Sequence, residues 1–204
     1  MLKMIAPANP PIAIPTMSVW RLSLDQYHAM IENGILRSGD PVEFLEGLLV
    51  AKMTKNSPHT ATLRRLARLF AALVGVRFDV HTQDPITTVD SEPEPDLSIV
   101  EHDNADYSHG HPTADQTALV VEVSDSTLSN DRELKKRVYA RAGIIEYWIV
   151  NLVDRQIEVY AAPTGPFAKP DYRQRLIFTP GQAIPVKLAG VDVGTISVSE
   201  VLPS

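Results

Sequence analysis

The chain has 204 residues and contains no cysteine, which excludes disulfide scaffolds, thiolate zinc sites and cysteine nucleophiles together. It also lacks any apolar run near the roughly 18 residues that a membrane-spanning helix needs. Prolines interrupt the segment from Met4 to Met17, so this segment cannot form the apolar helix of a signal peptide. These absences lead us to expect a cytoplasmic protein with no membrane association.

Positive charge is scarce. The chain has 19 lysines and arginines against 25 acidic residues, and its formal net charge is -6. This balance argues against a protein that coats nucleic acid by bulk electrostatics, so any contact with phosphate must be local. Two basic runs are the candidates for such a contact, although runs of this kind are usually solvated helix faces. They are Arg64, Arg65 and Arg68, and Arg132, Lys135, Lys136, Arg137 and Arg141.

The rest of the composition is that of an ordinary globular protein, with 44% hydrophobic and 22% charged residues. We expect a flexible N-terminal arm at residues 1–15, because this stretch is rich in proline, and a single domain at residues 16–204. Hydrophobic periodicity predicts helices and strands in mixed order, which indicates an α/β fold. The expected elements are helices after Ser23, at 57–75 and at 130–142, hairpins at 42–50 and 147–160, and strands at 76–83, 96–100 and 118–123.

Glu122 is the most informative residue, because it lies in the middle of an apolar strand that we expect to be buried on both faces. A buried, ionised carboxylate costs several kcal/mol unless it meets a cation or a hydrogen-bond donor. A structural ion pair with a neighbouring lysine or arginine is the simplest explanation for one such residue. Other residues in the chain favour a functional explanation.

Asp96 follows Pro95 at the start of another predicted strand. A Pro-Asp pair alone is only a turn signal. If the two strands are neighbours, however, Asp96 and Glu122 come together and repel each other unless a hard cation lies between them. Carboxylate oxygens suit Mg²⁺ or Mn²⁺, so the pair predicts a metal site.

Lys135 follows on the next predicted helix, where Asp131, Lys135 and Tyr139 recur at four-residue spacing and therefore share one face. An ammonium beside a metal-bound water stabilises the charge that develops on a phosphate or orients the nucleophile. The alternative is a solvated Asp-Lys pair worth a few tenths of a kcal/mol.

These segments resemble the signature of the Uma-two family of predicted endonucleases, which belongs to the PD-(D/E)XK restriction-endonuclease-like superfamily. The resemblance covers roughly residues 20–162. It is carried by residues 121–126, Asp131, Lys135, 139–144 and 146–150, and upstream by residues 42–47, 57–59 and 94–97.

The resemblance implies a restriction-endonuclease-like central mixed β-sheet flanked by helices, and Mg²⁺-dependent cleavage of phosphodiester bonds. Asp96 matches the aspartate of the PD element and Glu122 the acidic residue of the (D/E)XK element. Ser124 stands where the superfamily has its lysine, and Lys135 takes that place on the following helix. Glu43 matches an upstream acidic residue, although an isolated strand glutamate is more often simply exposed.

Two further residues are secondary candidates. His59 matches a family position at the start of a helix, where a neutral capping or packing role is at least as reasonable because a cation is disfavoured there. Tyr139 shares the helix face of Lys135. One departure from the family is that Gly47 is followed by Leu48 where the family has Gly-Glu, so an acidic helper is missing or is replaced by Glu46.

Two functions are therefore compatible with the sequence. The first is a Mg²⁺- or Mn²⁺-dependent DNA endonuclease in which Asp96 and Glu122 bind the metal, Lys135 acts on the phosphate and Glu43 assists. The second is a non-catalytic nucleic-acid or protein interaction module that retains the nuclease fold. Duplex cleavage with one site per subunit requires two subunits, and the hairpin at 146–160 offers a sheet edge, so we expect a homodimer.

Overall fold

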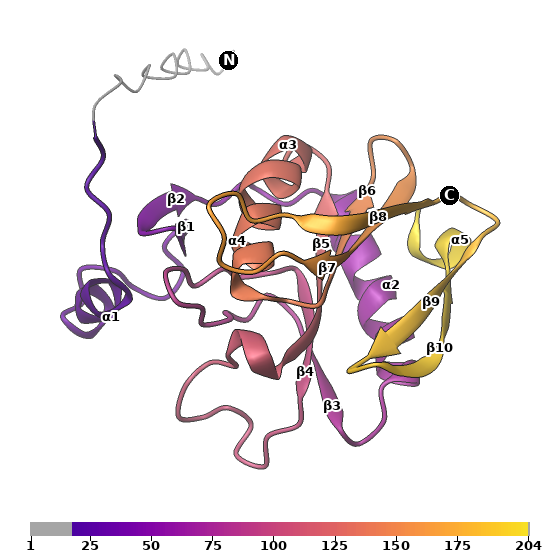
Figure 1. Ribbon diagram of the computed structural model, residues 1–204, viewed down its shortest axis with the longest axis horizontal. Coiled ribbons are helices and arrows are strands. Elements are labelled where there is room, and N and C mark those ends of the chain that lie inside the picture. The colour runs from indigo at the N-terminus through magenta and orange to yellow at the C-terminus, as the bar shows by residue number, and fades with distance from the viewer. Residues whose placement is uncertain (1–17, 204) are drawn as a thin grey trace, which may run out of the picture.

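The centre of the molecule is a six-stranded β-sheet with the strand order β3-β4-β5-β6-β7-β8, shown in the computed structural model in Figure 1. The structure describes residues 18–203, so the arm expected at residues 1–15 lies outside the described residues. Strands β5 and β6 are parallel and all other neighbouring pairs are antiparallel. The predicted mixed sheet is confirmed. The strands are β3 (Phe78–His81), β4 (Leu97–Glu101), β5 (Thr117–Ser124), β6 (Glu146–Asn151), β7 (Gln156–Pro163) and β8 (Tyr172–Phe178).

Helices and a small second sheet cover the two faces of the central sheet. Side chains alternate along β5, so that Leu119, Val121 and Val123 pack on one face and Val120 on the other. Glu122 therefore points to the same face as Val120. The first face carries α2 (Ser57–Leu73), the hairpin of β9 (Ala183–Leu188) and β10 (Val191–Ser197), and α5 (Val198–Val201); the second carries α3 (Leu128–Asn130), η2 (Asp131–Lys135) and α4 (Lys136–Ala142).

Helix α2 begins at Ser57, as expected. Its N-cap is Asn56, whose side-chain oxygen accepts a hydrogen bond from the His59 backbone N–H at 3.0 Å. Leu63, Leu66 and Phe70 of this helix are buried against the sheet. This packing fixes the first turn of α2, and with it His59, at the end of the sheet.

The predicted hairpin at 42–50 is formed by β1 (Val42–Leu45) and β2 (Leu48–Ala51). Glu46 and Gly47 both have positive φ angles, of 49° and 77°, as a two-residue turn of this hand requires. A Cβ on Gly47 would lie 2.7 Å from the Cβ of Arg21, so glycine is needed there for close packing as well. Helix α1 (Leu24–Glu32) has the predicted capping box and stacks Tyr27 on Phe44, but none of its residues is fully buried.

The helix predicted at 130–142 contains an irregular turn. Five residues, Asp131–Lys135, form the π-helical turn η2 between α3 and α4, so the assumed four-residue α-helical spacing does not hold from Asp131 to Lys135. Such turns occur frequently at functional sites. The helix ends at Gly143, as predicted, with a φ of 82°.

Two strand predictions need correction. The strand expected from Val76 begins only at Phe78, because residues 75–77 form a turn that leaves Val76 97% exposed. The hairpin at 146–160 does not offer a sheet edge, because β6 and β7 each have a neighbour on both sides. Among the strands that the structure describes, only β3 and β8 have a free side in this sheet, so the reason given for a homodimer was wrong and the homodimer itself stays a prediction.

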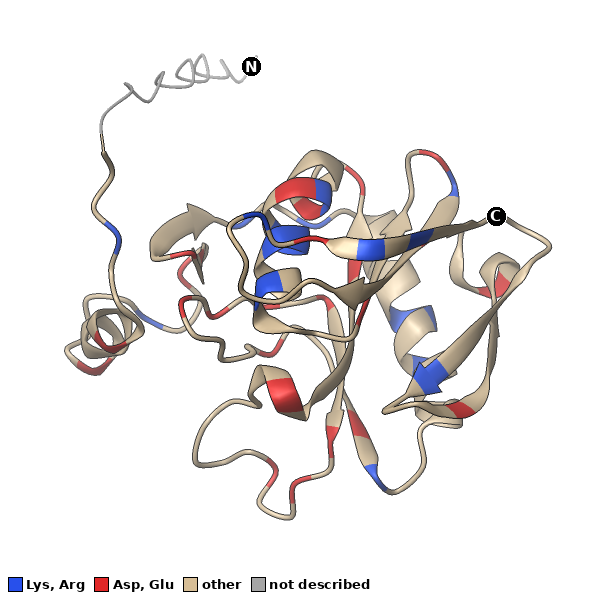
Figure 2. Ribbon diagram, viewed as in Figure 1, with Lys and Arg blue, Asp and Glu red and all other residues tan. Residues whose placement is uncertain are grey.

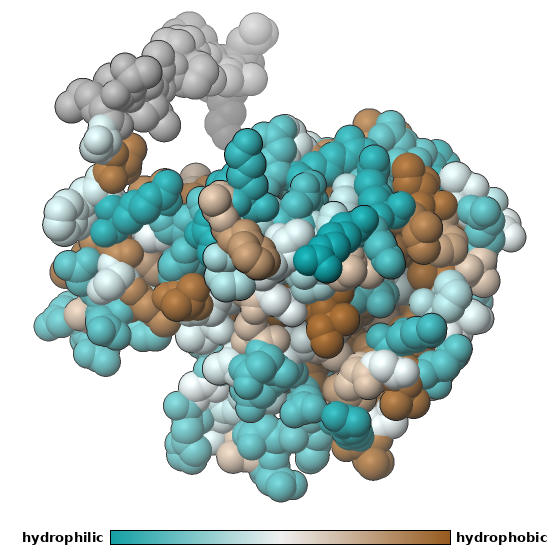
Figure 3. Space-filling view, viewed as in Figure 1, coloured by the Kyte–Doolittle hydropathy of each residue, from teal (hydrophilic) through white to brown (hydrophobic). Residues whose placement is uncertain are grey.

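The described surface is mixed in polarity. On the face seen in Figure 3, hydrophobic residues form small patches separated by hydrophilic ones. Among the described residues, no helix combines the length and the hydrophobicity that crossing a membrane would require.

Glu158 links the segment between β5 and β6, which contains η2, to the sheet. It is fully buried on β7 and is bound by Arg132 of η2, by Arg175 of β8 at 2.9 Å and by the Tyr160 hydroxyl at 2.6 Å. Burial alone would raise the pKa of this carboxyl. The hydrogen bonds from Arg132, Tyr160 and Asn151 and the charge of Arg175 outweigh burial and lower the pKa of Glu158 to about 2.

We therefore expect Glu158 to make the fold sensitive to acid. A carboxyl with a lowered folded-state pKa stabilises the protein above its ordinary pKa of 4.5, and this contribution disappears as the pH falls from 4.5 towards 2. Chemical unfolding at a series of pH values in this window will show a smaller loss of stability for Glu158→Gln than for the parent. The exposed Glu133→Gln is the control and should keep the parental slope; equal slopes for all three proteins would contradict the assignment.

Candidate functional site

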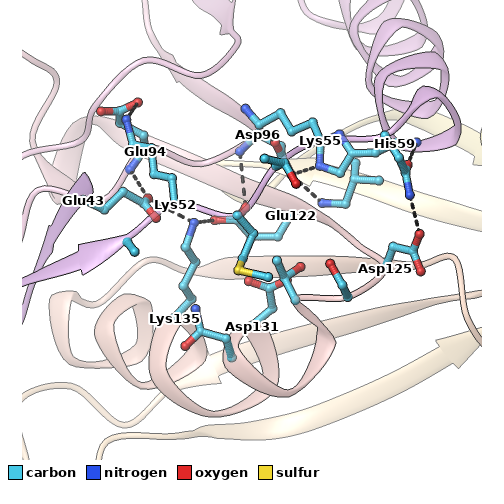
Figure 4. A pocket seen from close by; sticks show the side chains of 18 residues that line it. Glu43, Lys52, Lys55, His59, Glu94, Asp96, Glu122, Asp125, Asp131 and Lys135 are labelled. Carbon is cyan, nitrogen blue, oxygen red and sulfur yellow. Dashed lines mark hydrogen bonds and ion pairs between the residues drawn. The ribbon is translucent and has the colours of Figure 1, made fainter. Parts of the chain in front are cut away.

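The cavity that collects the predicted site residues lies where β4 begins and β5 ends (Figure 4). Its walls are β1, the residues from Ala51 to Asn56, the first turn of α2, and residues 123–131. Its volume is about 90 Å³, enough for an ion and a few water molecules. Of the predicted residues, all except Tyr139 line it: Glu43, His59, Asp96, Glu122 and Lys135.

Asp96 precedes β4 and is 6% exposed. Its Oδ2 accepts hydrogen bonds from the Val123 backbone N–H at 2.9 Å and from His59 Nε2 at 3.0 Å. Burial would raise the pKa of this carboxyl, but the two hydrogen bonds and the nearby positive charges lower it. Asp96 is therefore ionised, and its other oxygen, Oδ1, has only the ammonium of Lys55 nearby, at 3.7 Å.

Glu122 lies beside Asp96, because the antiparallel register of β4 and β5 pairs Leu97 with Val121. Its Oε1 is bound by Lys135 Nζ at 2.9 Å and by the Tyr139 hydroxyl at 2.7 Å. Its Oε2 receives only a long contact of 3.4 Å from the Asp96 backbone N–H. Burial raises the pKa of Glu122 to about 8 against the opposing charge of Lys135.

Lys135 is the last residue of η2, and it is 6% exposed. Its ammonium bridges two carboxylates, at 2.9 Å from Glu122 and 3.1 Å from Glu43. Burial alone would lower the pKa of this lysine, but the charges of Glu122, Glu43 and Asp131 raise it. Lys135 is thus a protonated, fixed charge in the cavity wall, and the alternative of a solvated Asp-Lys pair on the helix is wrong.

Glu43 is buried, contrary to the alternative of an exposed strand glutamate. In addition to Lys135, its carboxylate accepts a hydrogen bond from the Glu94 backbone N–H at 2.8 Å. Glu43 therefore links the β1–β2 hairpin both to η2 and to the residues that precede β4.

His59 and Tyr139 both contact predicted metal ligands. His59 binds Asp96, while its Nδ1 is buried and has no hydrogen-bond partner among the described residues. Tyr139 donates to Glu122, and its burial raises the pKa of the phenol well above the ordinary value, so it stays a donor. Glu46 does not replace the missing acidic helper, because it turns away from the cavity to bind Arg137 and Arg141.

Sequence reasoning missed the two lysines and the polar residues that complete the walls. Lys52 pairs with Glu94 at 2.6 Å, and Lys55 faces Asp96. Their clustering in the short polar stretch between the hairpin and α2 was the available signal. Opposite them, Asp125 binds the Asn56 side chain at 2.6 Å, and Asp131 binds the hydroxyls of Ser124 and Thr127.

The cavity holds more buried carboxyl groups than buried cations, and this crowding adds to burial in raising the pKa of Glu122. Four buried carboxylates, those of Glu43, Asp96, Glu122 and Asp131, face a single buried lysine. Asp96 and Glu122 each have one fully bonded oxygen and one that is nearly free, and oxygen donors of this kind fit Mg²⁺ or Mn²⁺. Within residues 18–203, no three histidine or acidic side chains form a ready metal cluster.

The chain is similar to known proteins in both sequence and fold. Residues 24–195 match the family described as "Uma2: Putative restriction endonuclease". The fold is similar to a crystal structure described as a "putative nuclease belonging to DUF820" from Anabaena variabilis, with a TM-score of 0.64 and 16% sequence identity. The similarity covers 88% of this chain and 97% of that one. No curated protein matches the chain.

Proposed function

The chain belongs to the Uma2 family, and from this premise we propose that it is a nuclease that hydrolyses phosphodiester bonds of DNA with Mg²⁺ or Mn²⁺. The observation that supports the proposal most is the pair of nearly free oxygens on Asp96 and Glu122 in a cavity with more buried carboxyl groups than buried cations. A divalent cation would balance these carboxylates, which the buried lysine alone does not.

In this proposal Asp96 and Glu122 would hold the ion, since each has one carboxylate oxygen that is nearly free. When bound, the ion supplies a water of lowered pKa and positive charge beside the phosphate. The Val123 N–H and His59 fix the Asp96 carboxylate, so its free oxygen keeps one direction. Tyr139 fixes the Glu122 carboxylate in the same way.

Lys135 provides the positive charge for the reaction. Because Glu43 and Glu122 hold its ammonium at the cavity wall, the charge is in place before a phosphate arrives. A preorganised charge of this kind stabilises the negative charge that develops on the attacked phosphate. Glu43, His59 and Tyr139 are positioning residues, since they act through Lys135, Asp96 and Glu122 respectively.

One observation favours the interaction module as a second candidate. Lys135, Glu122 and Glu43 satisfy one another within the protein, so these three residues would be stable as a structural cluster without chemistry. A module of this kind would bind nucleic acid or protein and leave it intact.

A cleavage assay tests the proposed function. We expect the purified protein to nick or cut DNA with Mg²⁺ or Mn²⁺ and to be inactive in EDTA. Ca²⁺ should support binding without turnover, because its larger and looser coordination sphere activates water less and places it less sharply. Duplex, single-stranded and branched substrates should be assayed together.

The contrary outcomes separate the two candidates. Equal cutting in EDTA would contradict a metal-dependent reaction. Inactivity with every ion on every substrate would favour the interaction module.

A further inference from the structure

The structure distinguishes the two basic runs of the chain by their ion pairs. Apart from Lys135, which is buried in the cavity wall, every basic side chain of η2 and α4 is neutralised by a carboxylate of the protein itself. The pairs are Arg132 with Glu158 and Asp154, Lys136 with Asp171, Arg137 with Glu46, and Arg141 with Glu46 and Asp90. This surface therefore has little charge left to offer a ligand.

The basic run on α2 is different. The helix contains Arg64, Arg65 and Arg68 but no acidic residue, and in Figure 2 it carries blue without red. None of the three arginines forms an ion pair with the residues at 18–203; Arg65 only reaches the Val201 carbonyl oxygen at 3.5 Å. In a chain of net charge -6, this uncompensated group of guanidinium ions on one helix is positive charge that an external anion can bind.

Packing directs two of these arginines to solvent. Leu63, Leu66 and Phe70 occupy the side of α2 that faces the sheet. Arg64 and Arg68 are both exposed, and their spacing of four residues puts them one turn apart on the outer side. They form a short row along the helix axis.

The row leads away from the cavity, because the first turn of α2 is part of the cavity wall. Asn56 and His59 line the cavity, and Lys55 precedes them with its ammonium near Asp96. With a rise of about 1.5 Å per residue, Arg64 lies about 12 Å and Arg68 about 18 Å along the axis from the N-cap. One strand of a duplex carries a phosphate about every 3.4 Å along the duplex axis, so these two distances correspond to roughly four to five nucleotides.

We propose that the outer face of α2, with Arg64 and Arg68, binds the sugar-phosphate backbone of the nucleic acid whose phosphodiester lies in the cavity. The inference rests on the proposed function for the identity of the ligand, and it adds the path by which that ligand crosses the protein. A polyanion fits because guanidinium groups bind phosphate oxygens well in solvent-exposed positions. The contact carries no base specificity, because it is to the backbone.

Binding of end-labelled single-stranded and duplex oligonucleotides, measured by fluorescence anisotropy in EDTA at several salt concentrations, tests the proposal without cleavage. The variant is Arg64→Gln/Arg68→Gln. Its matched control is Lys169→Gln/Arg173→Gln, which removes the same charge from exposed residues without ion pairs on the β7–β8 side. The Mg²⁺-dependent hydrolysis of bis(p-nitrophenyl) phosphate, which is too small to reach from the cavity to Arg64 and Arg68, is measured in parallel.

We expect the α2 double variant to bind DNA at least roughly tenfold more weakly near 0.1 M salt, with a slope of log K against log salt smaller by about 1.4 to 1.8. The control should keep the parental affinity and slope, and all three proteins should hydrolyse the small diester equally. Equal losses of DNA affinity in variant and control, or no DNA binding by the parent, would overturn the proposal that α2 binds the backbone. Failure of the nuclease function would appear separately, as absence of metal-dependent cleavage by a protein that still binds DNA through α2.

Discussion

Replacement of Lys135 with methionine is expected to lower the free energy of unfolding by about 3 kcal/mol and to abolish cleavage. The stability loss follows because Lys135 is the shared cation of two buried carboxylates, Glu122 and Glu43, which the variant leaves without their counter-charge. Burial raises the pKa of Glu122 to about 8 even with Lys135 present, and loss of Lys135 raises it further, so protonation of Glu122 limits the loss near neutral pH. Chemical denaturation and the DNA cleavage assay measure the two effects on the same preparation.

A second substitution tests whether the stability loss comes from the unpaired carboxylate. The double variant Glu122→Gln/Lys135→Met removes both charges of the pair and should recover at least about half of the lost stability, because neutral replacement of a buried pair is often tolerated. Cleavage should stay lost. If cleavage returned together with stability, neither Lys135 nor Glu122 would be needed for the reaction, and the proposed roles of both residues would be wrong.

The matched control for Lys135 is its neighbour Lys136. Lys136 pairs with Asp171 at 2.8 Å in a partly exposed position, where an ion pair contributes no more than about 1 kcal/mol. Lys136→Met should therefore change stability and cleavage only mildly. Equal effects at both positions would indicate a diffuse basic surface in place of a specific lysine.

Asp96→Asn should reduce cleavage by roughly 10²- to 10⁴-fold, since loss of a metal-binding carboxylate removes several kcal/mol of transition-state stabilisation at about 1.4 kcal/mol per factor of ten. The fold should survive, because the asparagine oxygen can still accept the hydrogen bond from the Val123 N–H. Removing one of four crowded carboxylates also relieves repulsion in the cavity. Calorimetry with Mn²⁺ should show weakened binding in parallel with the loss of cleavage.

Asp125→Asn is the control for this experiment. Asp125 lines the same cavity, but its carboxylate binds the Asn56 side chain and we assign it no metal. The control should keep most of the Mn²⁺ affinity and of the cleavage. If Asp96→Asn cut DNA as well as the parent, the proposed metal site would be wrong.

Much of the site was predictable because its main residues lie on strongly patterned elements. The apolar run around Glu122 required a buried strand, and a buried carboxylate required a partner. The antiparallel pairing of β4 with β5 then brings Asp96 beside Glu122, as the sequence led us to expect. These steps depend on burial and alternation, which are local properties of the chain.

The helix before Tyr139 was less predictable, because a π-turn replaces part of it. Periodicity assumes α-helical spacing and has no signal for one wider turn. Lys135 and Tyr139, which both bind Glu122, were nevertheless identified from the sequence. Asp131 instead turns to Ser124 and Thr127.

The sequence by itself determined the mixed α/β character, the buried position of Glu122 and the types of residue in the site, because these follow from local hydrophobic pattern and from the cost of burying charge. Only the tertiary structure decided which charges neutralise each other. Glu43 binds Lys135, Glu46 binds Arg137, and the arginines of α2 find no acidic partner within residues 18–203, because strand register and helix packing join segments far apart in the chain. Coulomb energies depend on these distances in space, which composition and spacing along the chain do not contain.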